Sequence, residues 1–197
     1  MNSQIIWIII LTVSVCAIIL SAAIGDPAVL MFMTGTISLG LAMVGIRDHR
    51  HLEAGGATRG LLSASIARHM GLIWAWGGLC LLVCYGLLLQ KTWHEWPVFF
   101  GGFAAAAVAC LLYASALTRD EHLGRQDEAM INLGRYLTIA QLLGMLATLI
   151  GIGIDPDKRL LSTLRPDWVA NNIFVAGAVA LTALSAYALL RDKRSNA

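Results

Sequence analysis

The side chains best suited to chemistry lie in two short polar segments, "RDHRHLE" and "RDEHLG". They contain His49, His51 and His122, with carboxylates that include Asp48 and Glu53. Imidazole and carboxylate groups are common ligands of zinc and other divalent metals, so one hypothesis is a metal site formed by the three histidines. The arginines in both segments would repel a cation, and the alternative is a solvated loop that faces lipid headgroups.

Four other polar residues suggest contacts with lipid or between helices. Arg68 and Arg135 stand near the start of long apolar runs, where an arginine either binds a lipid phosphate or simply extends to the headgroup layer. Gln141 lies well inside an apolar run, three residues after Thr138. A buried, unpaired amide is costly, so we expect Gln141 to form hydrogen bonds between helices. The alternative is that it lines a small polar cavity.

The apolar runs themselves contain no Asp, Glu, Lys, Arg or His. Proton relays, haem ligation and ion-coupled transport generally need such groups at membrane depth, and intramembrane proteolysis needs paired Asp or Ser with His. We therefore predict no catalytic residues, no cofactor and no enzyme activity. The formal net charge of only +2 also argues against a nucleic-acid partner.

The uncharged apolar runs must form the secondary structure that positions these polar residues. Only 13% of the residues are charged and 58% are apolar, whereas about a quarter of a soluble domain is charged. At about 1.5 Å per residue, each run is long enough to cross the ~30 Å hydrocarbon core as an α-helix. The sequence predicts an all-α integral membrane protein with six transmembrane helices, at residues 5–24, 27–46, 70–89, 97–117, 136–154 and 169–190.

Basic residues indicate how the chain is oriented. If both termini are cytoplasmic, ten of the 14 Lys and Arg residues fall on the inner side. Lys91, Lys158, Arg159 and Arg165 are the four on the outer side. Cytoplasmic segments carry such an excess, so we predict a multi-pass protein of the cell (inner) membrane with cytoplasmic N- and C-termini. A cleavable signal peptide is the alternative for the first run, although "MNSQ" lacks the basic side chain of such signals.

An internal repeat is suggested by the dipeptide Arg-Asp, which begins at positions 47, 119 and 191 and ends each even-numbered run. We predict one membrane domain, 1–197, built from the helical hairpins 1–48, 68–120 and 135–192 with cytoplasmic linkers 49–67 and 121–134. Each even run also carries small residues at four-residue spacing, which lets helices approach closely. These are Thr34, Ser38 and Ala42; Ala106, Cys110 and Ala114; and Ala178, Thr182 and Ala186. The alternative is that shared membrane constraints alone produce the pattern.

Two functions fit this composition. The first is an accessory, stress-response or scaffold component without catalytic machinery, which packs against lipids or other membrane helices. The second is a small channel or transporter for a neutral or lipid-like solute, as a monomer or an oligomer. The expected partners are the lipid bilayer and either other membrane-protein subunits or further copies of the chain. Small-residue faces that close on one another favour the scaffold, and a cavity that reaches Gln141 favours the second function.

Overall fold

In the computed structural model, which describes residues 3–24, 27–83, 96–124, 127–154 and 168–195, every secondary-structure element of those residues is an α-helix. The all-α prediction is therefore confirmed. The helices are α1 (Ser3–Ile24), α2 (Pro27–Ala54), α3 (Arg59–Val83), α4 (Trp96–His122), α5 (Glu128–Ile154) and α6 (Trp168–Ser195).

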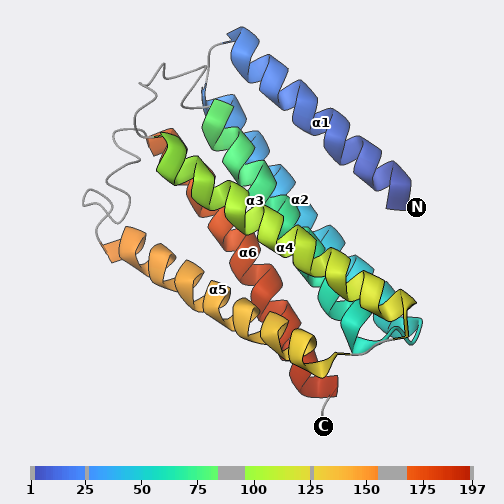
Figure 1. The fold of residues 1–197 in the computed structure, drawn as a ribbon. Coiled ribbons are helices and arrows are strands. Elements are labelled where there is room, and N and C mark those ends of the chain that lie inside the picture. The colour runs from blue at the N-terminus through green and yellow to red at the C-terminus, as the bar shows by residue number, and fades with distance from the viewer. Residues whose placement is uncertain (1–2, 25–26, 84–95, 125–126, 155–167, 196–197) are drawn as a thin grey trace.

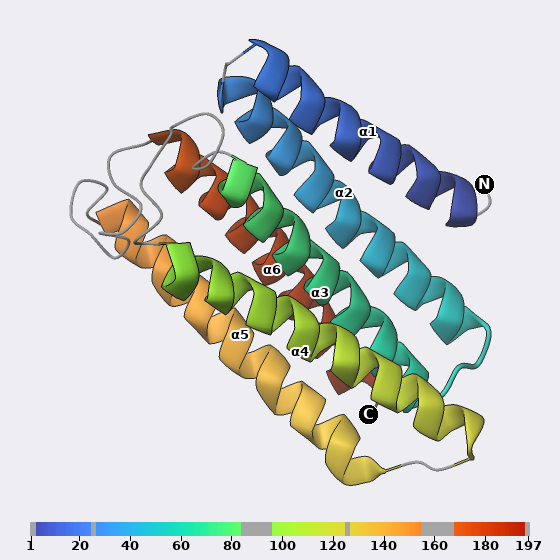
Figure 2. The ribbon, with the colours of Figure 1, turned by 45° about the horizontal axis from the view of Figure 1, so that its top comes forward.

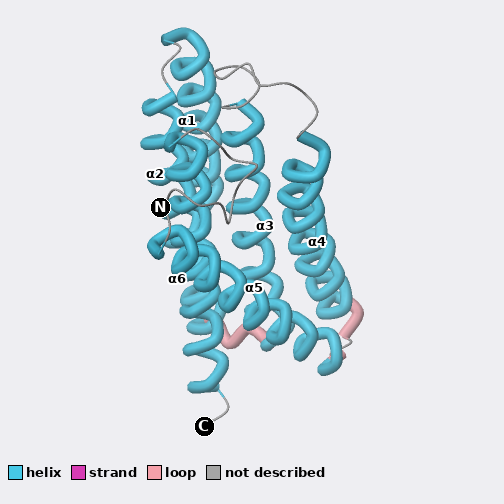
Figure 3. Tube along the Cα trace, turned by 90° about the vertical axis from the view of Figure 1, so that its left-hand side faces the viewer, coloured by secondary structure: helices cyan, strands magenta, loops and turns pink. Residues whose placement is uncertain are grey.

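The helices form a bundle around α3, which contacts α2, α4 and α6 (Figure 1). Helix α1 packs on α2 at the edge of the bundle (Figure 2). Helix α5 packs chiefly against α6 and has few contacts with α3 and α4. The α2–α3 and α4–α5 connections lie at the end of the bundle where the chain also ends (Figure 3).

Two helical segments in the described residues are long and apolar enough to cross a membrane, Arg59–Val83 and Gly101–His122. The first is largely buried in the bundle and the second is largely exposed. The six spans, the hairpin repeat and the position of the termini stay predictions. All four basic residues that were expected on the outer side lie outside the described residues.

The helices extend beyond the apolar runs into the segments that were expected to be linkers. Helix α2 continues to Ala54 and α3 begins at Arg59, so most of the stretch 49–67 is helical. Charged residues do not end a helix, but Gly56 does, at a positive φ of 72°. The amide N of Ala57 then donates to the Leu52 carbonyl over 3.0 Å, which closes the last turn of α2.

Side-chain caps stand at the starts of α3 and α5. Thr58 Oγ1 accepts from the Leu61 amide at 3.4 Å, at the start of α3. Asp127 Oδ1 accepts from the Ala129 amide at 2.9 Å, at the start of α5. Both side chains satisfy backbone donors that have no partner within their own helix.

Close packing around α3 depends on two glycines. Gly45 of α2 faces His69 of α3, and Gly71 of α3 faces α4 around Ala107. Neither position has room for a side chain of ordinary size without movement of the neighbouring helix. The largest fully buried apolar side chains near these contacts are Ile73, Leu81 and Leu184.

The small-residue stripes have different surroundings in the different helices. In α2, Thr34, Ser38 and Ala42 are all buried. Next to them, a Cβ on Gly35 would lie 3.7 Å from the Cβ of Ala176, which shows how closely α2 and α6 approach. The α4 stripe instead lines a cavity through Ala106 and Cys110. The stripe of α2 therefore closes on its neighbours, whereas that of α4 contacts α3 through Cys110 and also lines the cavity.

Candidate functional site

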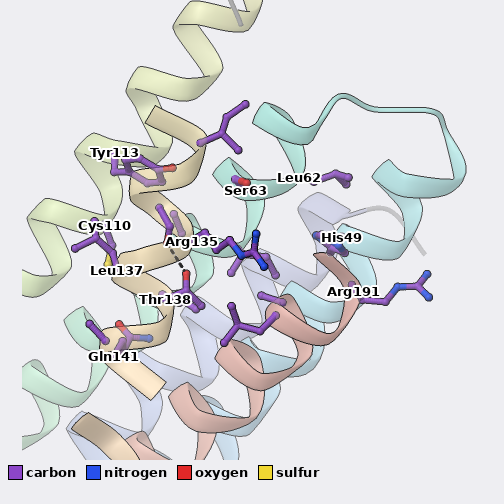
Figure 4. A pocket seen from close by; sticks show the side chains of 18 of the residues that line it. His49, Leu62, Ser63, Cys110, Tyr113, Arg135, Leu137, Thr138, Gln141 and Arg191 are labelled. Carbon is purple, nitrogen blue, oxygen red and sulfur yellow. Dashed lines mark hydrogen bonds between the residues drawn. The ribbon is translucent and has the colours of Figure 1, made fainter. Parts of the chain in front are cut away.

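A cavity of about 560 Å³ lies between α3, α4, α5 and α6, next to the end of α2 (Figure 4). Space remains between these helices because α5 packs mainly against α6 and makes few contacts with α3 and α4. Ligand pockets usually measure roughly 300–1,000 Å³, so this cavity has room for a small organic molecule. Arg135, Thr138 and Gln141, which the sequence singled out as polar residues, all line it.

One end of the cavity is charged. Arg59 lies at the start of α3. Arg135 extends into the cavity from α5, and Arg191 lies near the end of α6 (Figure 4). Glu53 is the one carboxylate among the described lining residues, and it forms an ion pair with Arg191. The described side chains that line this end therefore carry an excess of positive charge, and the carboxylate of Glu121 lies just outside the lining, beside Gly60.

His49 lies at the same end but contributes little charge. Its ring is 7% exposed and packs edge-to-face on Tyr187, with the ring centres 5.5 Å apart. Burial lowers the pKa of the imidazole below its ordinary value of 6.5, against smaller opposing effects of the Leu62 backbone and Glu53. His49 is therefore neutral near pH 7. Its Nδ1 atom is buried and has no hydrogen-bond partner among the described residues.

The rest of the cavity wall is mostly apolar. Helix α3 contributes Ile66, Met70 and Trp74, and the facing helices contribute alanines and larger apolar residues. Those of α4, α5 and α6 are Ala106, Ala109, Cys110, Ile131, Leu137, Ala140, Met145, Ala188 and Leu189. The cavity thus has a cationic end and an apolar body.

Gln141 joins three helices within this apolar body. Its Oε1 accepts a hydrogen bond from Nε1 of Trp74 in α3 at 3.0 Å. Its Nε2 donates to Oγ of Ser185 in α6, also at 3.0 Å. The residue therefore has both predicted features, since it links helices and lines the cavity.

Thr138 and Tyr113, two further polar residues of the body, also form hydrogen bonds within the protein. The hydroxyl of Thr138 donates to the Gly134 carbonyl of its own helix at 2.8 Å (Figure 4). The hydroxyl of Tyr113 in α4 donates to the Met130 carbonyl of α5 at 2.7 Å. A polar solute would have to compete with these internal hydrogen bonds, whereas a hydrocarbon chain would leave them intact.

The histidines of the metal hypothesis do not meet. His49 is buried against Tyr187, whereas His51 and His122 are exposed. Residues two apart on a helix point to nearly opposite sides, so the continuous helix α2 separates His49 from His51. Across the described residues, no group of three or more His, Cys, Asp or Glu side chains could hold a metal ion.

The two arginines predicted to bind headgroups have different surroundings. Arg135 lines the cavity, whereas the exposed Arg68 borders a separate hollow with Asp48 and His69. In that hollow, His69 Nε2 lies 3.5 Å from Asp48 Oδ2, and its Nδ1 is 2.8 Å from the Ser65 carbonyl oxygen. His69 therefore connects α2 to α3, a role that the sequence did not reveal.

Replacing Gln141 by leucine should lower the free energy of unfolding by about 1–2 kcal/mol, because Trp74 and Ser185 would both lose their partner. Denaturation in mixed micelles, followed by circular dichroism, measures this change. Thr138→Val is the matched control, since its hydrogen bond stays within one helix, and we expect a change below about 0.5 kcal/mol. Equal stability of the Gln141→Leu variant and the original protein would show that the amide does not hold the helices together.

Comparisons of the chain with known protein families, curated proteins and solved structures found no match.

Proposed function

We propose that the chain is a non-catalytic, six-span protein of the inner membrane that binds a lipid-like molecule in the cavity between α3, α4, α5 and α6. The six uncharged runs and the low content of charged residues support the membrane location. Two apolar helical segments of sufficient length add to this support. The excess of basic residues in alternate connections supports cytoplasmic termini.

The observation that carries the binding function is the polarity of the cavity. Its cationic end lies beside the helix ends, and its body is apolar and reaches Gln141. Trp74, Tyr113, Thr138 and Gln141 of the body already have hydrogen-bond partners within the protein. These features fit a molecule with a polar head and a hydrocarbon tail better than they fit a hydrophilic solute.

The cavity that reaches Gln141 favours the channel or transporter for a lipid-like solute over the scaffold, and lipid binding is a property that such a transporter would need. A scaffold or accessory role is the second candidate, and the surface of α1 favours it. Ile8, Val15, Ile19 and Ile24 of this helix are each at least 50% exposed. Such side chains need lipid, a subunit of another membrane protein or another copy of the chain around them. This role is compatible with lipid binding, because α1 lies on α2 and does not line the cavity.

Filling the cavity tests the proposed function. Gly144 lines the cavity, and a Cβ placed there would meet no atom within 4 Å. Gly144→Phe should therefore occupy ligand space without a clash in the fold. The probe is a 16-carbon lysophosphatidylcholine, added to protein in a neutral detergent and counted by native mass spectrometry. We expect one bound molecule per chain and about ten-fold weaker binding to the variant.

Gly102→Phe is the matched control. Gly102 also has open space around its Cβ position, but it is an exposed residue of α4 away from the cavity. It should bind the lysophospholipid as the original protein does. Equal binding by all three proteins would place the lipid outside the cavity and overturn the proposal.

A further inference from the structure

We infer that the ligand of this cavity is an amphiphile with one anionic headgroup, either a phosphodiester lipid or a fatty acid, drawn from the bilayer. Arg135 and Arg59 would hold the headgroup, and the hydrocarbon chain would run along α5 toward Met145. This inference rests on the proposed function and specifies the ligand of the same site.

The charge of the cavity end selects the headgroup. Arg59, Arg135 and Arg191 bring three positive charges to it, and Glu53, which pairs with Arg191, is the one carboxylate among the described lining residues. Arginine is suited to phosphate and carboxylate groups because its planar guanidinium donates two parallel hydrogen bonds. A cationic headgroup would be repelled there, and a zwitterionic one would gain less than an anionic one.

His49 offers one further contact at this end. Its ring is nine-tenths buried and neutral, and its Nδ1 has no partner among the described residues. In the neutral tautomer that carries its proton on Nδ1, His49 would donate this N–H to a headgroup oxygen. A buried polar atom without a partner is unusual in a folded protein, and a bound headgroup would supply that partner.

The length of the apolar body matches a lipid chain. Arg135 and Met145 both line the cavity from α5 and are ten residues apart. At about 1.5 Å per residue, they are separated by about 15 Å along the helix. The hydrocarbon core is ~30 Å thick, so this distance corresponds to one leaflet. A lipid whose headgroup lies at Arg135 would therefore place the end of its chain near the middle of the bilayer.

The experiment compares two lysophospholipids with the same 16-carbon chain, the anionic phosphatidylglycerol form and the zwitterionic phosphatidylcholine form. Binding is measured by native mass spectrometry in a neutral detergent. We expect the anionic lipid to bind about ten-fold more tightly, and Gly144→Phe to weaken the binding of both. Arg135→Gln should reduce the preference about five-fold, as expected for one cation near a membrane surface. Arg135→Lys, which keeps the charge, should retain most of it.

Arg68→Gln is the matched control, because Arg68 is an arginine of α3 that lies outside this cavity. It should leave the preference unchanged. If both lipids bind equally and Gly144→Phe still blocks them, the proposed function stands but the anionic headgroup is wrong. If Arg68→Gln lowers the preference as much as Arg135→Gln, surface charge and not the cavity selects the lipid, which also overturns the inference.

Inorganic phosphate distinguishes a lipid from a free anion. At millimolar concentration it should not displace the anionic lysophospholipid, because the apolar body supplies a large part of the binding free energy. The contrary result is that phosphate displaces the lysophospholipid and that the Gly144→Phe variant still binds phosphate. It would mean that the arginines bind a soluble anion and that the lipid assignment is wrong.

Discussion

Replacing Gly71 by valine should prevent α3 and α4 from packing at their present distance. A Cβ at this position would lie 2.9 Å from Cγ of Leu111, 3.1 Å from the Ala107 carbonyl oxygen and 3.1 Å from Cβ of Cys110. The Leu111 side chain can move, but a backbone oxygen and a Cβ can move only with the whole of α4. The extra methyl groups of valine would increase these clashes.

We expect this variant to lose at least about 3 kcal/mol of unfolding free energy, the upper range for an overpacked site. That is a large part of the ~5–15 kcal/mol that typically stabilises a folded domain. Denaturation in mixed micelles, followed by circular dichroism, measures the loss. The yield of monodisperse protein after detergent extraction should also fall.

Gly102→Val is the control for the β-branched side chain. Gly102 lies in α4, and a Cβ there would have nothing within 4 Å. Both variants carry the same intrinsic helix propensity, so the difference between them reports the helix contact. Similar stability of the two variants would show that α3 and α4 are not in close contact at Gly71.

Periodicity and charge predicted the helices well, because an uncharged run of this length has few other stable conformations in lipid. They did not predict where helices end. Arg50 and Glu53 were placed in the linker 49–67, but α2 continues through them. The backbone leaves the helix at Gly56, where the glycine permits a positive φ. The charged residues therefore mark the end of the apolar run, and Gly56 marks the end of the helix.

The sequence also identified part of the cavity. Gln141 was singled out because a buried amide needs a partner, and Arg135 because an arginine at the start of an apolar run can bind a lipid phosphate. Their partners could not be found, since Trp74 is 67 residues away from Gln141 along the chain and Ser185 is 44 residues away. Hydrogen bonds between residues so far apart along the chain depend on how each helix is rotated and tilted in the bundle. The pattern of apolar runs does not specify these angles.

His69 illustrates the same limit. Its neighbour Arg68 received a functional interpretation because exposed cations near a membrane surface are easy to recognise. On a helix, however, successive residues point about 100° apart, so His69 faces α2 while Arg68 faces outward. Gly45 was the missed signal, since a small residue in a helix often marks a close approach by a neighbour.

Replacing Gly45 by alanine should separate α2 from α3 and cost about 2–3 kcal/mol of unfolding free energy. The added Cβ would lie 2.9 Å from both Cβ and Cγ of His69 and 3.2 Å from Cδ1 of Leu184. The His69 ring cannot easily turn away, because its Nδ1 lies 2.8 Å from the Ser65 carbonyl and its Nε2 faces Asp48. Equilibrium denaturation in mixed micelles measures the loss.

A double-mutant cycle with His69→Gly shows whether this clash is the cause. Once both His69 atoms are removed, Gly45→Ala should cost less than about 1 kcal/mol, because only the flexible Leu184 side chain remains in its way. Gly40→Ala on the same helix is the control, since a Cβ there meets nothing within 4 Å. It should be neutral or slightly stabilising, because alanine favours a helix more than glycine does. If Gly45→Ala costs the same with and without the imidazole side chain of His69, the small residue at position 45 serves another contact.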